Sequence, residues 1–433
     1  MSVQLPCETL ISKIVDTGLC TRCGTCVGVC HLDNISIPDY MGDCLPSAGN
    51  RCDSCGLCLS SCPGGEVDFS RLEKRFICDS KTDPFTGIVK SAWVARAVDE
   101  KVRASGASGG IVTALLNFLI ETDNADGALV YSMDRDKPFV GRGVIARSKA
   151  EVAEASQSKY HLSPMNEALA DLRDAERIAV SGLPCQIHGI RKLQDSGWEK
   201  ASSIGPCVGI YCGNNLYYEA TRVMMKKMGV KSLEDVKRLS YREGDWPGYF
   251  SVVNKNDESL RVSKLDFNQA IPFYINHRCL FCTDLTNELS DISVGDAWSK
   301  EGLEEGGWSI VLARTGEGEK LVRSAIETGI IIAEDISHQE VLSMHAHAFD
   351  LKKYGSWLRV SAWKYLGYKV PSFNQARPDI KTGRKIAEIL FSMQFMLCSS
   401  KVGRKMFSLL PVGALGPIFR WLRRTWINIS RRN

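Results

Sequence analysis

Cysteines near the start of the chain fall into two runs with the same spacing, C-x2-C-x2-C-x3-C. The runs are Cys20, Cys23, Cys26, Cys30 and Cys52, Cys55, Cys58, Cys62. In proteins that bind two 4Fe–4S clusters through such runs, three thiolates bind one cluster and the fourth binds the other. We therefore expect two clusters, one bound by Cys20, Cys23, Cys26 and Cys62, the other by Cys52, Cys55, Cys58 and Cys30.

A pair of zinc sites is the alternative for these cysteines. Zinc needs four ligands, usually supplied as two C-x2-C pairs, so the third cysteine of each run would have no role. Proline follows Cys62 but His31 follows Cys30, and we interpret His31 as a surface residue or a nearby donor, not a ligand. Three cysteines outside the runs are interpreted as apolar fillers or free thiols: Cys7, Cys44 and Cys78.

The composition is that of a globular protein and excludes disorder, collagen and coiled coil as overall descriptions. The chain has 433 residues, 44% hydrophobic and 24% charged, which suggests about three domains. It has 17 cysteines, no cationic and apolar leader at its start and no long apolar run. We therefore expect a cytoplasmic protein whose cysteines bind metal and do not form disulfides.

Strand-like and helix-like segments alternate from about residue 88 onward, which predicts an α/β domain with a mostly parallel sheet. The predicted strands are 91–98, 127–131, 177–181, 207–211, 292–294 and 309–313, and the predicted helices are 109–120, about 184–193, 217–228 and 317–328. We expect a small ferredoxin-like domain at 1–85, a larger domain at 86–375 and a basic extension at 376–433.

Two features of the larger domain could bind a cofactor. The loop 105–110 is rich in glycine and serine and precedes a helix, so its backbone N–H groups could hold a phosphate or an anionic ring edge, or it could simply start the helix. Four further cysteines lie outside the two runs: Cys185 and Cys212 each follow a predicted strand, and Cys279 and Cys282 form a C-x2-C pair. Because strand ends gather at one edge of an α/β sheet, these thiols could hold a third cluster. The alternative is one reactive thiol among buried cysteines.

The chain resembles the coenzyme F420 hydrogenase/dehydrogenase beta-subunit family over about residues 15–330. The motifs that carry the resemblance are Ser108-Gly-Gly-Ile-Val-Thr-Ala-Leu-Leu116, Gly182-Leu-Pro-Cys-Gln186, Trp246-Pro-Gly248, Arg278-Cys-Leu-Phe-Cys-Thr-Asp-Leu-Thr-Asn-Glu288 and Asp291-Ile-Ser-Val-Gly-Asp-Ala-Trp298. The resemblance implies a flavin-binding α/β domain with FAD beside an iron–sulfur cluster. It also implies that Cys185, Cys212, Cys279 and Cys282 are the ligands of that third cluster.

The flavin site that the resemblance implies includes Ser105, Gly106, Ser108, Gly109, Gly110, Thr113, Lys159, Ser163, Trp246 and Asp284. The implied activity is that of an iron–sulfur flavoprotein oxidoreductase that passes electrons between the clusters and coenzyme F420 or an analogous substrate, through FAD. The alternatives are an electron-transfer subunit without its own substrate site, a reductase of another organic substrate, and a scaffold with structural clusters. We expect a redox partner protein and no nucleic acid, and the sequence identifies no catalytic residue.

Histidines and the C-terminal tail are less specific. Lys159 and His161 could serve the flavin or an acidic substrate, or form an ordinary polar loop, and His188, His345 and His347 are interpreted as structural. Residues 389–433 carry eight Lys and Arg and no acidic residue, against a net charge of +4 for the whole chain. Such a basic amphipathic segment suits the anionic inner face of a membrane, an acidic protein partner, or a terminal helix on the domain surface.

Overall fold

The computed structural model describes residues 4–78, 82–298, 307–375 and 377–430. Within these residues the main sheet has eight strands in the order β14-β4-β13-β12-β8-β7-β5-β6. Their bounds are β4 Ser91–Ala97, β5 Gly127–Met133, β6 Gly141–Ala146, β7 Ile178–Gly182, β8 Ile204–Ile210, β12 Ile292–Asp296, β13 Ser309–Ala313 and β14 Ile331–Asp335. The α/β class is confirmed, and all six predicted strands form within a few residues of their expected bounds.

The prediction of a mostly parallel sheet holds only for the centre. Strands β5, β7, β8 and β12 pair in parallel, whereas β6, β13, β4 and β14 join the sheet antiparallel. One reason is visible between β5 and β6, which are joined by residues 134–140 only. That connection is too short for the crossover that a parallel pair needs.

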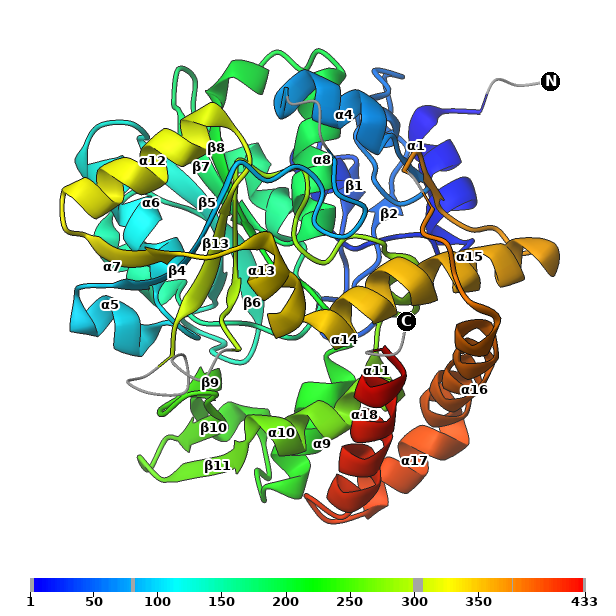
Figure 1. Ribbon diagram of the computed structural model, residues 1–433. Coiled ribbons are helices and arrows are strands. Elements are labelled where there is room, and N and C mark those ends of the chain that lie inside the picture. Colours follow the sequence, from blue (N-terminus) through cyan, green and yellow to red (C-terminus); the bar gives the residue numbers. More distant parts are fainter. Residues whose placement is uncertain (1–3, 79–81, 299–306, 376, 431–433) are drawn as a thin grey trace.

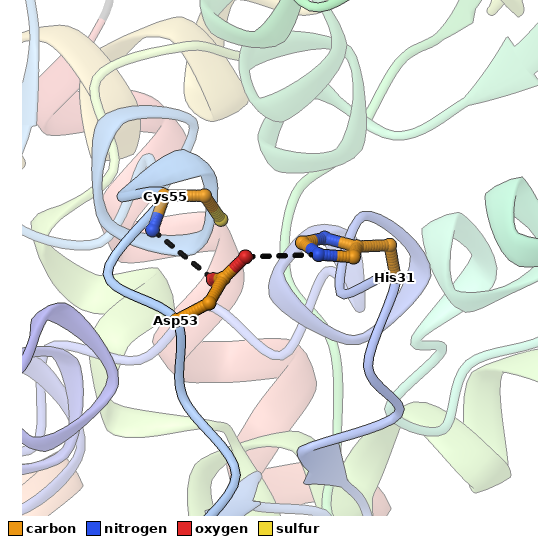
Figure 2. Close-up of side chains that lie close together, drawn as sticks. All are labelled: His31, Asp53 and Cys55. Atoms are coloured by element: carbon orange, nitrogen blue, oxygen red, sulfur yellow. Dashed lines mark hydrogen bonds and ion pairs between the residues drawn. The ribbon is translucent and has the colours of Figure 1, made fainter.

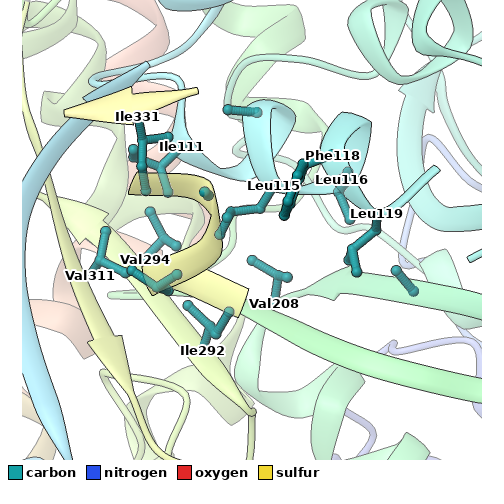
Figure 3. Packing of buried hydrophobic residues seen from close by; sticks show 14 of the residues in the cluster. Ile111, Leu115, Leu116, Phe118, Leu119, Val208, Ile292, Val294, Val311 and Ile331 are labelled. Carbon is teal, nitrogen blue, oxygen red and sulfur yellow. The ribbon is translucent and has the colours of Figure 1, made fainter. Parts of the chain in front are cut away.

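One face of the sheet is covered by α6 (Ile111–Glu121) and α12 (Gly316–Glu327) (Figures 1 and 3). Leu115 and Leu116 of α6 are almost fully buried there, packed in a cluster with Val208 of β8 and Val311 of β13 (Figure 3). The strands contribute alternate residues to this core because successive side chains point to opposite faces. In β7, Ala179 belongs to this cluster, whereas its neighbours belong to the cluster on the other face.

The opposite face is covered by α8 (Pro184–Asp195) and by the cysteine-rich N-terminal segment. Ile187 and Ile190 of α8 pack with Ile178 and Val180 of the sheet and with Phe69 of the N-terminal segment. The elements of that segment are α1 Pro6–Leu10, α2 Thr25–Gly28, β1 Ile35–Ser36, β2 Ser47–Ala48, α3 Leu57–Ser60, β3 Glu66–Val67 and α4 Phe69–Phe76. Strand β15 (Ser372–Phe373) returns to pair with β3, so residues far apart in the sequence complete this region.

A smaller unit lies beside the carboxyl ends of the parallel strands (Figure 1). It contains an antiparallel sheet of β9 Val236–Glu243, β10 Tyr249–Asn254 and β11 Ser259–Ser263, with helices α9 Glu219–Lys227, α10 Lys264–Phe267 and α11 Ile271–Tyr274. The remaining helices are α5 Glu100–Ser105, α7 Lys149–Glu154, α13 His338–Met344, α14 Ala346–Phe349, α15 Ser356–Tyr365, α16 Thr382–Ser399, α17 Lys401–Leu409 and α18 Gly416–Ser430. Across the described residues, none of the helices combines the length and apolar character needed to span a bilayer.

Candidate iron–sulfur and cofactor site

The two cysteine runs adopt the same local structure. In each run a glycine in the left-handed region, Gly24 (φ 86°) or Gly56 (φ 77°), starts the short helix α2 or α3 that carries the third cysteine. Backbone N–H groups point at sulfur close by: Asn34 donates to Cys30 Sγ at 3.3 Å and Gly64 donates to Cys62 Sγ at 3.4 Å. Such donors stabilise thiolates bound to iron.

Thiols of the two runs lie close to one another. Burial, followed by the thiols of Cys23 and Cys20, raises the pKa of Cys62 to about 12. Burial and the thiols of Cys55 and Cys52, with smaller effects of Cys7 and Cys30, raise the pKa of Cys58 to about 12. Thiols packed this closely ionise easily only when a cation neutralises them, as iron does. The side chains therefore fit iron–sulfur clusters, and the ligands of each cluster stay a prediction.

The second run lies at the surface, where Cys55 is exposed. Figure 2 shows His31 Nε2 at 3.0 Å from the Asp53 carboxylate, whose other oxygen accepts a hydrogen bond from the backbone N–H of Cys55. His31 is therefore an exposed residue with a carboxylate partner, in agreement with its interpretation as a surface residue. Among the described residues outside the runs, Cys7 and Cys44 are buried and Cys78 is exposed.

The structure brings the four other predicted ligands together. Cys185 begins α8, Cys212 follows β8, and Cys279 and Cys282 lie on and just after a short 3-10 helix at His277–Phe281. Burial, then the thiols of Cys23, Cys212, Cys279 and Cys282, raises the pKa of Cys185 well above its usual value. Cys185 is thus close both to its own group and to Cys23 of the first run.

Arg278 joins this third thiol group to the N-terminal segment. Its buried guanidinium donates to the carbonyl oxygens of Leu19 at 3.1 Å and of Gly64 at 3.1 and 3.2 Å. Hydrogen bonds from a charged donor to buried carbonyls are among the stronger ones in proteins. The two regions are therefore held in fixed register.

A cavity of about 660 Å³ opens at the carboxyl ends of the parallel strands. Its wall includes the ends of β5, β7, β8 and β12, the edge at which α/β proteins usually bind ligands. Cys212 of the third thiol group is part of this wall. The buried hydroxyl of Tyr211, also in the wall, has no hydrogen-bond partner in the described part of the chain, so it is available to a bound molecule.

The predicted flavin residues divide into two sets. Those that line the cavity are Gly106, Ser108, Gly110, Thr113, Lys159 and Ser163, and those that do not are Ser105, Gly109, Trp246 and Asp284. Gly109 packs directly on β4, where an added Cβ would lie 2.5 Å from the carbonyl oxygen of Ala95. Trp246 packs against Trp298, which does line the cavity, with ring centroids 4.5 Å apart.

Two of these charged residues are engaged within the chain. The buried ammonium of Lys159 donates to three carbonyl oxygens at the end of α7, including Ala155 at 2.5 Å, and burial lowers its pKa to about 7. Asp284 accepts a hydrogen bond from His188 Nε2 at 2.8 Å, and both side chains are buried. His188 is therefore structural, as predicted.

Two other predicted histidines, His161 and His345, are also buried. His161 bonds the Tyr241 hydroxyl at 2.9 Å, and burial lowers its pKa to about 3, so the ring is neutral. His345 Nε2 lies 2.8 Å from the carbonyl oxygen of Asp296, and both His345 and His347 line the cavity.

The sequence reasoning missed part of the wall. Tyr211 ends a predicted strand just before Cys212, and Trp298 ends the motif 291–298 just after a predicted strand, so the strand-end rule could have found both. The C-terminal helices also contribute wall residues: Phe391, Gly416, Phe419 and Arg420. No local sequence signal indicates that these residues reach the cavity.

Comparison with known proteins supports the same assignment. Residues 92–170 and 175–339 match the families described as coenzyme F420 hydrogenase/dehydrogenase, beta subunit, N-terminal and C-terminal parts. Residues 17–40 and 49–66, which contain both cysteine runs, match a 4Fe–4S binding domain.

Three similar proteins show the extent of the match. The chain is 30% identical to coenzyme F420 hydrogenase subunit beta of Methanococcus voltae over 58% of this chain and 86% of that protein. It is 26% identical to the coenzyme F420-dependent sulfite reductase of Methanocaldococcus jannaschii over 77% of this chain, but spans only 49% of that protein. In the F420-reducing [NiFe] hydrogenase complex from Methanosarcina barkeri, one chain superimposes with a TM-score of 0.54 at 23% identity, over 68% of this chain and 99% of that one.

The fold, the thiol groups and the family matches together define an iron–sulfur protein of an oxidoreductase family. The chain belongs to the coenzyme F420 hydrogenase/dehydrogenase beta-subunit family, with a 4Fe–4S binding domain at its N-terminal end. The predicted family and the ferredoxin-type domain are confirmed.

Proposed function

We propose that this chain is an iron–sulfur flavoprotein oxidoreductase that exchanges electrons between a protein redox partner and a two-electron organic carrier. Coenzyme F420 is the first candidate carrier, because several relatives bear it in their names. Clusters exchange single electrons and a flavin exchanges one or two, so together they suit a chain that connects these two kinds of carrier.

One observation carries the proposal: Cys212 belongs both to the third thiol group and to the wall of the large cavity. Cys185 of that group is next to Cys23 of the first run, and the second run reaches the surface at Cys55. The three predicted ligand groups therefore form a series from the protein surface to the cavity. The exposed end suits a protein partner, and the cavity suits a small molecule.

Residues of the cavity can hold FAD by ordinary contacts. The backbone N–H groups of Ala107, Ser108 and Gly110 and the hydroxyl of Tyr211 are donors for its polar atoms. The N–H groups of Gly106 and Gly109 are bonded to Arg103 and Ser309 of the chain itself. The apolar side chains around them, including Ile111 and Leu116 of α6, exclude water from bound rings. The closed group of Cys185, Cys212, Cys279 and Cys282 would hold the third cluster beside it.

Anaerobic purification followed by iron, sulfide and flavin assays tests this proposal. We expect about twelve irons and one FAD per chain, and oxidation of reduced F420 by an artificial one-electron acceptor. Cys212→Ser should lower the iron content to about eight and abolish this oxidation, whereas the exposed Cys78→Ser, outside all three groups, should change neither.

Other outcomes would assign a different role. About eight irons with FAD in the unmodified chain would remove the third cluster. Flavin without F420 turnover would favour another organic substrate. Clusters without flavin would leave an electron-transfer subunit, and zinc in place of iron would leave a scaffold.

A further inference from the structure

Helices α16, α17 and α18 leave large apolar side chains uncovered. On α16 the exposed residues follow one another at helical spacing, which makes a continuous stripe along the helix. They are Ile386, Ile389, Leu390, Met393, Met396 and Leu397, with Val402, Met406 and Leu409 on α17 and Ile418 and Trp421 on α18. Each of these side chains is between 52% and 75% exposed.

These stripes are not the faces by which the helices pack on the protein. On α16 the inward residues include Arg384, Glu388 and Phe395, all buried. On α17 the buried Phe407 stacks on Phe273 of α11 with ring centroids 4.5 Å apart. The helices are thus already fixed to the body, and their outer stripes form a second apolar surface. Contiguous apolar surface of this kind marks an interaction site.

The charges around the stripes all have one sign. Glu388 is the last acidic residue of the chain, and it is buried in ion pairs with Arg359 and Arg384. Exposed cations on the same helices include Lys401, Lys405, Arg420 and Arg424. No exposed carboxylate accompanies them in the described part of 382–430. The surface therefore complements a negatively charged one.

We propose that α16, α17 and α18 form a membrane-binding face that lies on an anionic lipid surface. Amphipathic helices bind such surfaces by burying aliphatic side chains at the acyl boundary while lysine and arginine contact the headgroups. The cores of protein interfaces are enriched in aromatic residues, Met and Arg, whereas seven of these eleven residues are Ile, Leu or Val. The proposal is independent of the cofactors and substrate proposed above.

Co-sedimentation of the anaerobically purified full chain with vesicles tests the apolar part of this face. We expect binding to vesicles that contain phosphatidylglycerol. The affinity for vesicles of phosphatidylcholine alone should be at least about tenfold lower. The triple variant L390Q/M393Q/L397Q should bind at least about tenfold more weakly. The control V98Q/I332Q changes exposed apolar residues of the main domain and should bind like the unmodified chain.

The same assay tests the charges. K401Q/K405Q should lose about fivefold in affinity for each lysine removed, and high salt should reduce the difference. K101Q/K320Q removes two exposed lysines from α5 and α12 and should have no effect. Equal losses in the test and control variants, or equal binding to both lipids, would overturn the proposal. A dimer in sedimentation velocity that L390Q/M393Q/L397Q disperses would also overturn it, since the face would then join two copies.

Discussion

Arg384 on α16 fastens the C-terminal helices to the body of the protein. Its guanidinium contacts both carboxylate oxygens of Asp350 at 2.8 to 3.0 Å and lies 2.8 Å from Glu388, and it is fully buried. Glu388 in turn pairs with Arg359 of α15 at 2.5 Å. Two buried cations thus balance two buried carboxylates.

Arg384→Met should release α16, because it leaves the Asp350 carboxylate buried without a partner. Breaking a buried pair from one side costs about 3–5 kcal/mol, which corresponds to a roughly 150- to 4,000-fold larger population of the opened helix. Hydrogen exchange of the α16 amides measures that population directly. Because Phe391 of α16 lines the cavity, we also expect weaker retention of whatever the cavity holds.

Two variants control for this effect. Lys385→Met removes the same charge from the next position, where the side chain is exposed, and should leave α16 exchange unchanged. D350N/R384M removes a cation and an anion together and keeps the Arg359–Glu388 pair. Hydrogen exchange of the α16 amides in this variant should therefore return most of the way to that of the unmodified chain. Exchange in R384M that rises less than about fivefold would refute the reasoning, since the network would then contribute about 1 kcal/mol or less.

Three further predictions concern stability. The Arg147 guanidinium donates to the Glu176 carboxylate at 2.5 and 2.9 Å and lowers its pKa. The pair therefore stabilises the folded state fully above the unfolded pKa of about 4.3, and this stabilisation is lost as pH falls through the lower folded pKa. Glu176→Gln should therefore cost about 1–2 kcal/mol in urea unfolding at pH 7 and progressively less below about pH 4, and a pH-independent cost would contradict this. Leu115→Ala, at a fully buried position, should cost about 2–5 kcal/mol, and a loss under about 1 kcal/mol would mean that the core refills the space. Gly143→Ala should lower the unfolding midpoint because its Cβ would lie 2.1 Å from a backbone oxygen, whereas Gly316→Ala has open space and should not.

Local spacing predicted the features that depend on short stretches of chain. The runs from Cys20 to Cys62 needed only the ligand spacing, and the six predicted strands needed only runs of β-forming residues between turns. The nearness of Cys185 to Cys212 followed from the rule that parallel strand ends share an edge, whereas the grouping of both with Cys279 and Cys282 rested on the family resemblance.

Features set by distant contacts were not predicted. The sheet of β9, β10 and β11 and the edge strand β14 carry no signal that separates them from other short strands. Asp284 has the residue type of a ligand-binding group, but His188, far away in the sequence, occupies its carboxylate. Phe391 and Arg420 reach the cavity only because α16 and α18 fold back, which no nearby residue indicates.

The cavity wall formed by the last helices has a consequence for how the protein is made. Chains emerge from the ribosome N-terminal end first, and folding follows that order. Both cysteine runs precede residue 63 and the other predicted cluster ligands precede residue 283, whereas Phe419 and Arg420 of α18, which complete the wall, come much later in the sequence. The cavity therefore stays open on one side until α18 has been made, and bulky cofactors can enter before that helix closes behind them.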